Sequence, residues 1–254
     1  MKQSIILWIA ALIISFSTGY IQSTLSPDYP ANGTISMYSG DVSYSFDKVY
    51  RSKGDFNVWV VSDFKGLNGY LEWKDKDSAN WQKVEMLPSR GAIAAKIPAH
   101  PPLSFVEYRV VLNDNGKAYL APKDGAVQLQ FLGHVPSQIM MFYYITLFAG
   151  LLLGIRTGLD GFKDKPRIKL YTIFTLISFF SFTLIFSTVK KGCELGIIGG
   201  TKVAQINELF SSGPVLLFIL WIAALILIFN TKSPKFWALS ASVLTVITFL
   251  LGKF

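Results

Sequence analysis

The chain has 254 residues, of which 51% are apolar and only 16% are charged, and 20 of them are phenylalanines. A soluble domain carries about 25% charged residues, so this deficit predicts a membrane protein. The aromatic content excludes a disordered chain. A disulfide framework is excluded because Cys193 is the only cysteine, and a Cys/His zinc site is nearly excluded because His100 and His134 are the only histidines.

The formal net charge of +8 is unevenly distributed along the chain. Residues 24–135 hold 12 basic and 12 acidic side chains, so this stretch is neutral. The basic excess lies beside long apolar runs, as it does in proteins whose loops set the orientation of membrane helices. Nucleic-acid binding needs a clustered basic surface instead, so we expect no nucleic-acid partner.

The first apolar run covers residues 5–20 and extends to residue 25 without a charged side chain. We predict a signal-anchor transmembrane helix over residues 1–25. The alternative is a cleaved signal peptide, for which Lys2 supplies a weak basic start. No small-x-small cleavage site with alanine follows the run, and this favours the uncleaved anchor.

Four further apolar runs predict a C-terminal transmembrane bundle of four helices over residues 136–254. A helix needs about 20 residues to cross a bilayer, with a lower limit near 17, and flanking residues can extend the shorter runs. Pro136 and Pro214 suit the first turn of a helix. The connector 230–234 ends in Pro234 and predicts a tight helical hairpin. The runs are 139–155, 170–189, 214–230 and 236–251.

The basic connectors predict the orientation of these helices. Basic side chains crowd residues 156–169, and Lys232 and Lys235 lie between the last two runs, so both connectors should be cytoplasmic. The N-terminus is then cytoplasmic, and residues 26–135 and the C-terminus lie on the outer side. Three lysines in residues 190–213 weaken the contrast.

Between residues 33 and 131 the pattern changes to the alternation typical of strands that are buried on one face. In residues 56–62, Phe56, Val58 and Val60 share a face, and in residues 106–110 three apolar residues alternate with Glu107 and Arg109. Asn-Gly pairs predict hairpin turns at 68–69 and 115–116. Eight or nine short strands predict an all-β sandwich or barrel over residues 26–135. The predicted strands are 34–38, 42–46, 56–62, 70–74, 81–86, 92–97, 105–112, 117–120 and 126–131.

One stretch resembles a known kind of module. It consists of Trp81-Gln-Lys-Val-Glu-Met86, Gly-Ala-Ile-Ala-Ala-Lys-Ile-Pro at 91–98, Phe-Val-Glu-Tyr-Arg-Val at 105–110 and Asn-Asp-Asn-Gly at 113–116. Together these segments resemble the second half of immunoglobulin-like or fibronectin type III-like modules. The Cys…Trp…Cys core of true immunoglobulin domains is absent, so the resemblance implies only the sandwich. Such modules usually bind or space other parts, although a fold does not fix function.

The whole arrangement resembles bacterial inner-membrane proteins of unassigned activity. The resemblance rests on two segments, Phe-Leu-Gly-His-Val-Pro at 131–136 and Gly-Ile-Arg-Thr-Gly-Leu-Asp at 154–160. This resemblance implies a multi-pass protein of the cytoplasmic membrane, with residues 26–135 and the C-terminus in the periplasm. It implies no activity.

Two stripes of small or polar residues are candidate helix-packing sites. Gly150, Gly154 and Gly158 recur every four residues, a spacing that lets a neighbouring backbone approach closely in lipid. Packing within this chain is the first interpretation and contact with another subunit is the alternative. We predict that the stripe meets either the N-terminal anchor helix or a helix of a partner subunit. We interpret a second stripe, on the last helix, as a surface that packs against a neighbouring helix. The alternative is that it forms the polar lining of a cavity. It consists of Ala238, Ser242, Thr245, Thr248 and Gly252.

His134 precedes the second helix and is the weakest candidate site. It would suit a haem or quinone contact, but no second histidine lies in any predicted helix. We therefore interpret it as an ordinary interfacial residue, and we expect no cofactor and no metal. Residues 201–210 form a short amphipathic segment that we expect to lie flat on the outer interface.

The absent motifs narrow the function further. No ionisable residue lies in the core of any predicted helix, which disfavours ion- or proton-coupled transport. No nucleophile–base pair, P-loop or dinucleotide fingerprint is present, so we expect no enzyme and no catalytic residue. The sequence predicts a non-catalytic accessory or structural subunit of an inner-membrane complex, whose partners are the lipid bilayer and other membrane subunits. The alternatives are a passive pore or carrier for a small neutral or lipid-like solute, and a haem- or quinone-associated subunit.

Overall fold

A computed structural model describes residues 2–62, 66–89, 91–123, 125–199 and 206–252. The chain divides into two compact units. The helical unit comprises Met1–Ser26, Val135–Cys193 and Ile197–Phe254, and the sandwich unit comprises Pro27–His134 with Glu194–Gly196. The N-terminal helix therefore belongs with the C-terminal helices, whereas the sequence treats it as a separate segment.

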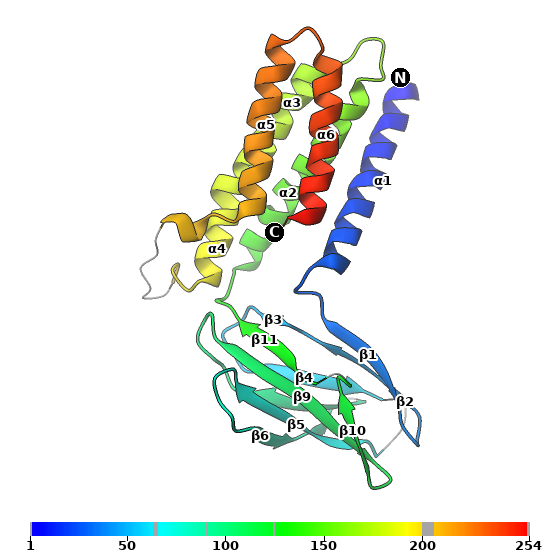
Figure 1. Cartoon of the computed structure of the whole chain (residues 1–254), viewed down its shortest axis with the longest axis vertical. Helices are drawn as coiled ribbons and strands as arrows, with labels where there is room; N and C mark the ends of the chain where they lie inside the picture. Colours follow the sequence, from blue (N-terminus) through cyan, green and yellow to red (C-terminus); the bar gives the residue numbers. More distant parts are fainter. Residues whose placement is uncertain (1, 63–65, 90, 124, 200–205, 253–254) are drawn as a thin grey trace. The chain divides into compact units, whose positions relative to one another are not determined.

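The helical unit contains five helices that are long and apolar enough to cross a membrane. The third is continuous over Ile168–Glu194 and includes a π-helical stretch. Figure 1 shows the helices of this unit lying side by side. The elements are α1 (Lys2–Leu25), α2 (Ser137–Asp160), α3 (Ile168–Phe180), the π-helix Ser181–Ser187, α4 (Thr188–Glu194), the 3₁₀ turn Ile206–Leu209, α5 (Ser212–Asn230) and α6 (Pro234–Leu251).

The helix ends agree with the predicted signals and extend beyond the apolar runs. Pro136 is the N-cap of α2, Pro214 lies in the first turn of α5, and Pro234 begins α6 directly after the predicted connector. The second helix continues past the end of its apolar run to Asp160, so it contains Arg156, which the sequence counts with the basic connector.

The interior of the helical unit is filled by aromatic rings. Phe179, Phe182 and Trp221 are completely buried, and Tyr143 is 2% exposed. The outer surfaces of the helices remain strongly apolar, with 63% of Ile6 exposed. Helix α1 packs against α2 and α6, and α5 packs between α3 and α6.

The sandwich unit contains two sheets of mostly antiparallel strands. One sheet has the order β1-β2-β4-β8-β7, and the other has the order β3-β11-β9-β5-β6 with β10 also pairing with β9. Among the described residues, only the pairing of β3 with β11 is parallel. The strands are β1 (Ala31–Ser36), β2 (Asp41–Phe46), β3 (Val49–Tyr50), β4 (Phe56–Val61), β5 (Asn68–Asp75), β6 (Gln82–Glu85), β7 (Leu87–Ser89), β8 (Ala92–Ile97), β9 (Phe105–Asp114), β10 (Lys117–Ala121) and β11 (Val127–Phe131).

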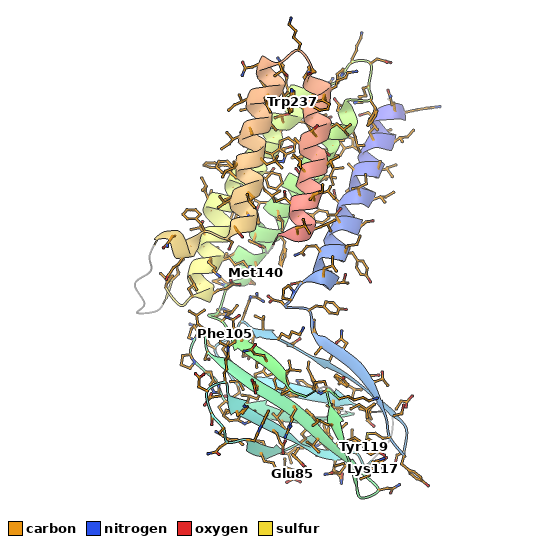
Figure 2. All side chains as sticks on the ribbon, in the orientation of Figure 1. Glu85, Phe105, Lys117, Tyr119, Met140 and Trp237 are labelled. Atoms are coloured by element: carbon orange, nitrogen blue, oxygen red, sulfur yellow. The ribbon has the colours of Figure 1, made fainter. Side chains whose placement is uncertain are left out.

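The predicted alternation of the strands is confirmed. Phe56, Val58 and Val60 point into the core between the sheets, and the residues between them are exposed. On β9, Val106, Tyr108 and Val110 are fully buried. Outside this core, Lys117 and Tyr119 of β10 lie next to each other, as Figure 2 shows. The Lys117 ammonium is 5.3 Å from the centroid of the Tyr119 ring.

Of the two predicted Asn-Gly turns, one is confirmed and the other is wrong. Asn115-Gly116 forms the β9–β10 hairpin, and both residues have positive φ as such a turn requires. Asn68-Gly69 lies inside β5, where a Cβ at Gly69 would stand 2.5 Å from the Val111 carbonyl oxygen. The predicted strand 81–86 is the short β6, after which the chain changes sheets into β7. The turn signals at residues 90 and 124 lie outside the described residues.

Candidate functional site

A buried ion cluster lies in the last turn of α2. The Arg156 Nη1 and Asp160 Oδ1 atoms are 2.9 Å apart, and neither side chain is exposed. Lys163 Nζ lies 3.0 Å from the same carboxylate oxygen, and the backbone N–H of Arg167 donates to Asp160 Oδ2. The cluster thus holds two cations and one anion. Among the described residues, none of the guanidinium nitrogens makes an aligned hydrogen bond.

Aromatic rings from two other helices cover the buried guanidinium. Its Cζ atom lies 5.3 Å from the ring centroid of Trp8 on α1 and 4.9 Å from that of Tyr171 on α3. Such contacts strengthen when the cation is removed from water. Helix α1 is also tied to this end of the unit by a hydrogen bond from Lys163 Nζ to Ser4 Oγ, at 3.3 Å.

This cluster corrects the expectation that no ionisable residue lies inside a helix core. The sequence counts Arg156 with the basic connector because the apolar run stops at residue 155, although the resemblance implies that a helix ends at 154–160. In the structure the helix continues, and Arg156 and Asp160 are covered by neighbouring helices. Ionisable groups inside membrane-spanning helices are by default candidates for a functional role. A lack of ionisable residues in the helices therefore no longer counts against ion- or proton-coupled transport.

The glycine stripe of α2 faces other helices of the same chain. A Cβ at Gly150 would stand 2.7 Å from the ring of Phe179 on α3, and one at Gly154 would stand 3.0 Å from Trp221 on α5. A Cβ at Gly158 would stand 2.4 Å from the Ser242 Cβ on α6. The nearest neighbours of the stripe therefore lie on α3, α5 and α6 of the same chain, and the anchor helix and a partner subunit are not needed to explain its small residues.

The small and polar stripe of α6 faces the interior of the helical unit. Ala238 and Thr245 are fully buried, and Ser242 is 7% exposed. Trp221 Nε1 donates a hydrogen bond of 2.9 Å to the Thr245 hydroxyl oxygen, and this hydroxyl donates to the Ala241 carbonyl. The stripe thus meets the Trp221 indole and the glycines of α2.

The other candidates do not join these groups. His134 is exposed and lies in the sandwich unit. Cys193 is buried. Among the described residues, no group of three or more His, Cys, Asp or Glu side chains is placed to hold a metal ion. The amphipathic segment 201–210 is described only from residue 206, where a 3₁₀ turn begins.

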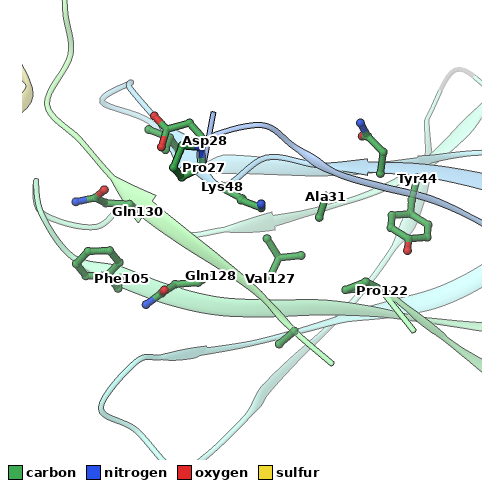
Figure 3. A pocket seen from close by; sticks show the side chains of 13 residues that line it. Pro27, Asp28, Ala31, Tyr44, Lys48, Phe105, Pro122, Val127, Gln128 and Gln130 are labelled. Atoms are coloured by element: carbon green, nitrogen blue, oxygen red, sulfur yellow. The ribbon is translucent and has the colours of Figure 1, made fainter. Parts of the chain in front are cut away.

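A groove of about 550 Å³ opens on the sandwich unit between β11 and the β1–β2 hairpin. Figure 3 shows Tyr44 and Pro122 near one end of the opening, and Asp28 and Lys48 near the other. Its volume lies within the range of about 300–1,000 Å³ that is usual for ligand sites. The lining residues are Pro27, Asp28, Ala31, Asn32, Tyr44, Lys48, Val49, Phe105, Pro122, Ala126, Val127, Gln128 and Gln130.

The local sequence explains both walls of this groove. On one side, Gly33 and Tyr44 are directly opposite each other in the β1–β2 pair, and a Cβ at Gly33 would stand 2.3 Å from the Tyr44 hydroxyl. The glycine therefore leaves room for the ring, which stacks on Phe46 with a centroid distance of 4.9 Å. On the other side, β3 pairs with β11 only at Gln130 and Phe131, so the earlier part of this β11 edge faces the groove.

The groove is lined by a mixture of polar and apolar residues, with one acidic and one basic side chain among them. Side-chain amides of Asn32, Gln128 and Gln130 supply donors and acceptors. Asp28 is engaged by Arg51, whose Nη2 lies 3.4 Å from Asp28 Oδ2. Lys48 is half-buried, and among the described residues no carboxylate lies within ion-pair distance of its ammonium.

A second ion cluster adjoins Asp28 within the sandwich unit. Arg51 Nε donates to Glu194 Oε1 at 2.8 Å, and Glu194 is 5% exposed. Burial alone would lower the pKa of Arg51, but the two carboxylates outweigh burial and raise that pKa above its usual value. Arg51 is therefore held charged, and it keeps Asp28 fixed beside the groove.

Sequence reasoning missed both the ion cluster and the groove. The arginine–aspartate spacing of four residues at 156 and 160 is a helix-compatible signal, and it would have extended the second helix. The groove has no comparable signal, since it depends on β3 beginning only at Val49, beside Gln130. Comparison with models of known protein families gives no match, and comparison with curated proteins gives none either.

Proposed function

We propose that this protein is a membrane-anchored, non-catalytic accessory subunit whose sandwich unit binds a partner outside the cytoplasmic membrane. The observation that carries this proposal is the groove between β11 and the β1–β2 hairpin. It combines a volume usual for ligand sites with amide side chains in its lining and a half-buried lysine. The helices then serve to hold this unit at the membrane and to contact other membrane subunits.

We further propose that the sandwich is immunoglobulin-like. Taking β4, β8 and β7 as strands B, E and D gives one sheet in the order B-E-D, to which β1 and β2 are added. Taking β5, β9 and β11 as C, F and G gives the C-F-G order of the second sheet. Trp73 on β5 is buried, as is the tryptophan of strand C in that fold. Modules of this kind are widely used for binding.

The proposed location is the bacterial cytoplasmic membrane. Five helices have the length and composition to span it. The connectors that carry Lys163, Lys165, Arg167 and Lys235 would face the cytoplasm, because basic loops are retained there. The sandwich would then lie in the periplasm.

The alternatives receive less support from specific contacts. A passive pore along the polar stripe of α6 would need an open path, but Trp221 and Gly158 meet that stripe at Thr245 and Ser242. A haem or quinone contact at His134 would need a second group beside this exposed histidine, and among the described residues of the sandwich unit the other histidine, His100, bonds to Asp75 and the Pro98 carbonyl.

Site-specific photo-cross-linking tests the binding role. A photoreactive amino acid at Asn32 places the probe in the groove, and one at Glu85 on β6 places it on an exposed strand outside the groove. In membranes of cells that make the full chain, we expect a discrete cross-linked partner from position 32 and none from position 85. The same products from both positions, or none from either, would contradict the proposal.

A further inference from the structure

The free edge of β11 makes the groove a place where another strand can be added. Gln130 N–H donates to the Lys48 carbonyl and Leu132 N–H donates to the Tyr50 carbonyl, both at 2.8 Å, so these amides point toward β3. Phe131 N–H points the other way, to the Ser104 carbonyl. Backbone groups of a strand alternate in this manner. The Gln128 N–H therefore points to the same edge as that of Gln130, at a level that β3 does not reach.

The polarity of an added strand follows from β3. That strand runs parallel to β11 and begins beside Gln130. A segment that continues the same parallel pairing beside Gln128 would have its C-terminal end directed at the start of β3. Lys48 is the residue that immediately precedes β3, and Figure 3 shows its side chain extending into the opening.

The charge at that end selects the kind of segment. Lys48 is half-buried as a residue and its ammonium has no carboxylate partner among the described residues, whereas Asp28 is engaged by Arg51. A carboxylate that arrives at the end of an added strand would supply the missing counter-charge. Capture of a terminal carboxylate and strand addition are both established ways of binding peptides.

We propose that the groove binds the C-terminal segment of a partner protein as a strand parallel to β11, with its terminal carboxylate at Lys48. This inference rests on the proposed binding function and specifies its ligand class. Main-chain hydrogen bonds to Ala126 and Gln128 would hold the segment, and the amide side chains around it would complete its polar contacts.

The test uses the full chain in nanodiscs and three forms of the peptide Thr-Val-Thr-Val. The first has a free C-terminal carboxylate and the second has a C-terminal amide. The third is N-methylated at the backbone nitrogens of its two central residues, which point to opposite edges of a strand, so that both edges are blocked. We expect the acid to bind, the amide to bind about tenfold or more weakly, and the methylated form not to bind. The loss reflects a charge-assisted contact and ladder hydrogen bonds. Bound acid should slow hydrogen exchange at the Gln128 amide.

Variants of the chain locate the interaction. Gln128→Pro removes the N–H that points into the groove and leaves the β9 ladder intact, a position where proline is tolerated in an edge strand. It should weaken acid binding about tenfold, whereas Gln128→Thr keeps the N–H and should stay within about threefold. Lys48→Gln should abolish the preference for the acid over the amide. Retained exchange protection in β9 verifies folding of the proline variant.

Three results would overturn strand addition: no binding of the acid at millimolar concentration, equal binding of acid and amide, or equal binding of methylated and unmethylated peptide. The last comparison needs no variant, so it stands even where Gln128→Pro does not fold. The cross-link from position 32 separates this inference from the proposed function. A cross-link that persists in Gln128→Pro and Lys48→Gln leaves the binding role standing and removes the strand, and the absence of any cross-link in the parent chain removes both.

Discussion

Two arginine–carboxylate pairs of this chain have nearly the same length and opposite surroundings. In the helical unit, Arg156 Nη1 and Asp160 Oδ1 are 2.9 Å apart and both side chains are fully buried. In the sandwich unit, Arg109 Nε and Glu72 Oε2 are 2.8 Å apart, and the side chains are 31% and 16% exposed. Both guanidinium groups also lie against aromatic rings, that of Arg109 at 4.4 Å from the Trp81 centroid.

The distance between the charged atoms therefore does not determine what an ion pair contributes to stability. An exposed pair keeps most of its hydration, and its attraction is screened by water and salt. A buried pair has lost that hydration, so removal of one partner leaves a charge with no compensation. The two pairs should therefore respond very differently to the same kind of substitution.

The two units also differ in where their uncharged polar and apolar residues lie. In the sandwich the core consists of apolar side chains, and the ion pairs lie on the outer face of β5 and β9. In the helical unit the hydroxyls of Thr172 and Thr175 are fully buried and bond to carbonyl oxygens of their own helix, while isoleucines cover the outside. Water surrounds the first unit, and we propose that lipid surrounds the second.

The largest expected effect comes from breaking the buried pair. Asp160→Leu leaves the Arg156 guanidinium without a counter-charge, and loss of one partner of a buried pair typically costs about 3–5 kcal/mol. We expect a large fall in the thermal stability and folded yield of the detergent-purified chain, measured by unfolding scans and gel filtration.

The double substitution Arg156→Met with Asp160→Leu is the matched control. It removes both charges and fills the site with apolar atoms, a change that is often neutral for buried pairs. Recovery of most of the lost stability is therefore expected. If the double variant were no better than Asp160→Leu, the cost would lie in packing and the buried charge would not explain it.

The next largest effect on stability is expected at Gly158, the glycine of the stripe that lies closest to a neighbouring helix. Gly158→Ala would place a Cβ 2.4 Å from the Ser242 Cβ, so the helices must separate, and overpacking of this kind typically costs about 1–3 kcal/mol. Gly19→Ala on α1 is the control, because its Cβ would meet Phe148 at an ordinary 3.6 Å. We expect lower stability for the first variant and unchanged or higher stability for the second. Equal effects would mean that α2 does not hold α6 at this distance.

How far the sequence predicts each unit follows from the same contrast. In the sandwich the alternation of Phe56, Val58 and Val60 locates the core because only one face of the strand avoids water. In the helices the length of each apolar run predicts the element, but not its inner face, because Ile6 on the outside and Phe179 on the inside are equally apolar.

The features that the sequence does not predict correctly depend on contacts between segments that lie far apart in the sequence. Arg156 is buried because Trp8 and Tyr171 lie against it, and no local pattern records that. Gly69 fits inside a strand because the Val111 carbonyl approaches it closely, although the preceding asparagine makes the pair look like a turn. The groove lies beside the part of β11 that precedes the start of β3, and the position of that start depends on how the sheets pack.

A smaller effect is expected at the hydrogen bond between α5 and α6. Thr245→Val keeps the volume of the side chain but removes the acceptor of the Trp221 indole N–H, at a typical cost of about 1–3 kcal/mol for an unsatisfied buried donor. Thr172→Val is the control, since its equally buried hydroxyl bonds only to its own helix. Trp221 should show altered near-ultraviolet circular dichroism in the first variant alone. An unchanged spectrum and unchanged stability would contradict the contact.

Within the sandwich, Asp114 should make local stability depend on pH. Hydrogen bonds from the Ser39 hydroxyl and N–H hold the pKa of this carboxyl below its usual value. A lowered folded-state pKa stabilises above the unfolded-state pKa of about 3.9, and this stability is lost as the pH falls through the folded-state value. Hydrogen exchange at residues 37–40, corrected for intrinsic rates, should be faster in Asp114→Asn than in the parent at about pH 6. The difference should vanish in acid, and a difference that grew in acid would reverse the assigned sign.

The smallest effect is expected for the exposed counterpart of the buried pair. In a double-substitution cycle of Arg109→Met and Glu72→Leu, the coupling energy should lie between about 0.2 and 1 kcal/mol, because water screens both partners. Part of the single-variant loss at Arg109 should come from its contact with Trp81 and should not appear in the coupling. Raising the salt concentration should reduce the coupling of this pair and leave that of Arg156 with Asp160 nearly unchanged, since buried charges are screened much less. A coupling of several kcal/mol at Glu72 would show that two pairs of equal length behave alike, and would remove the distinction between the two units.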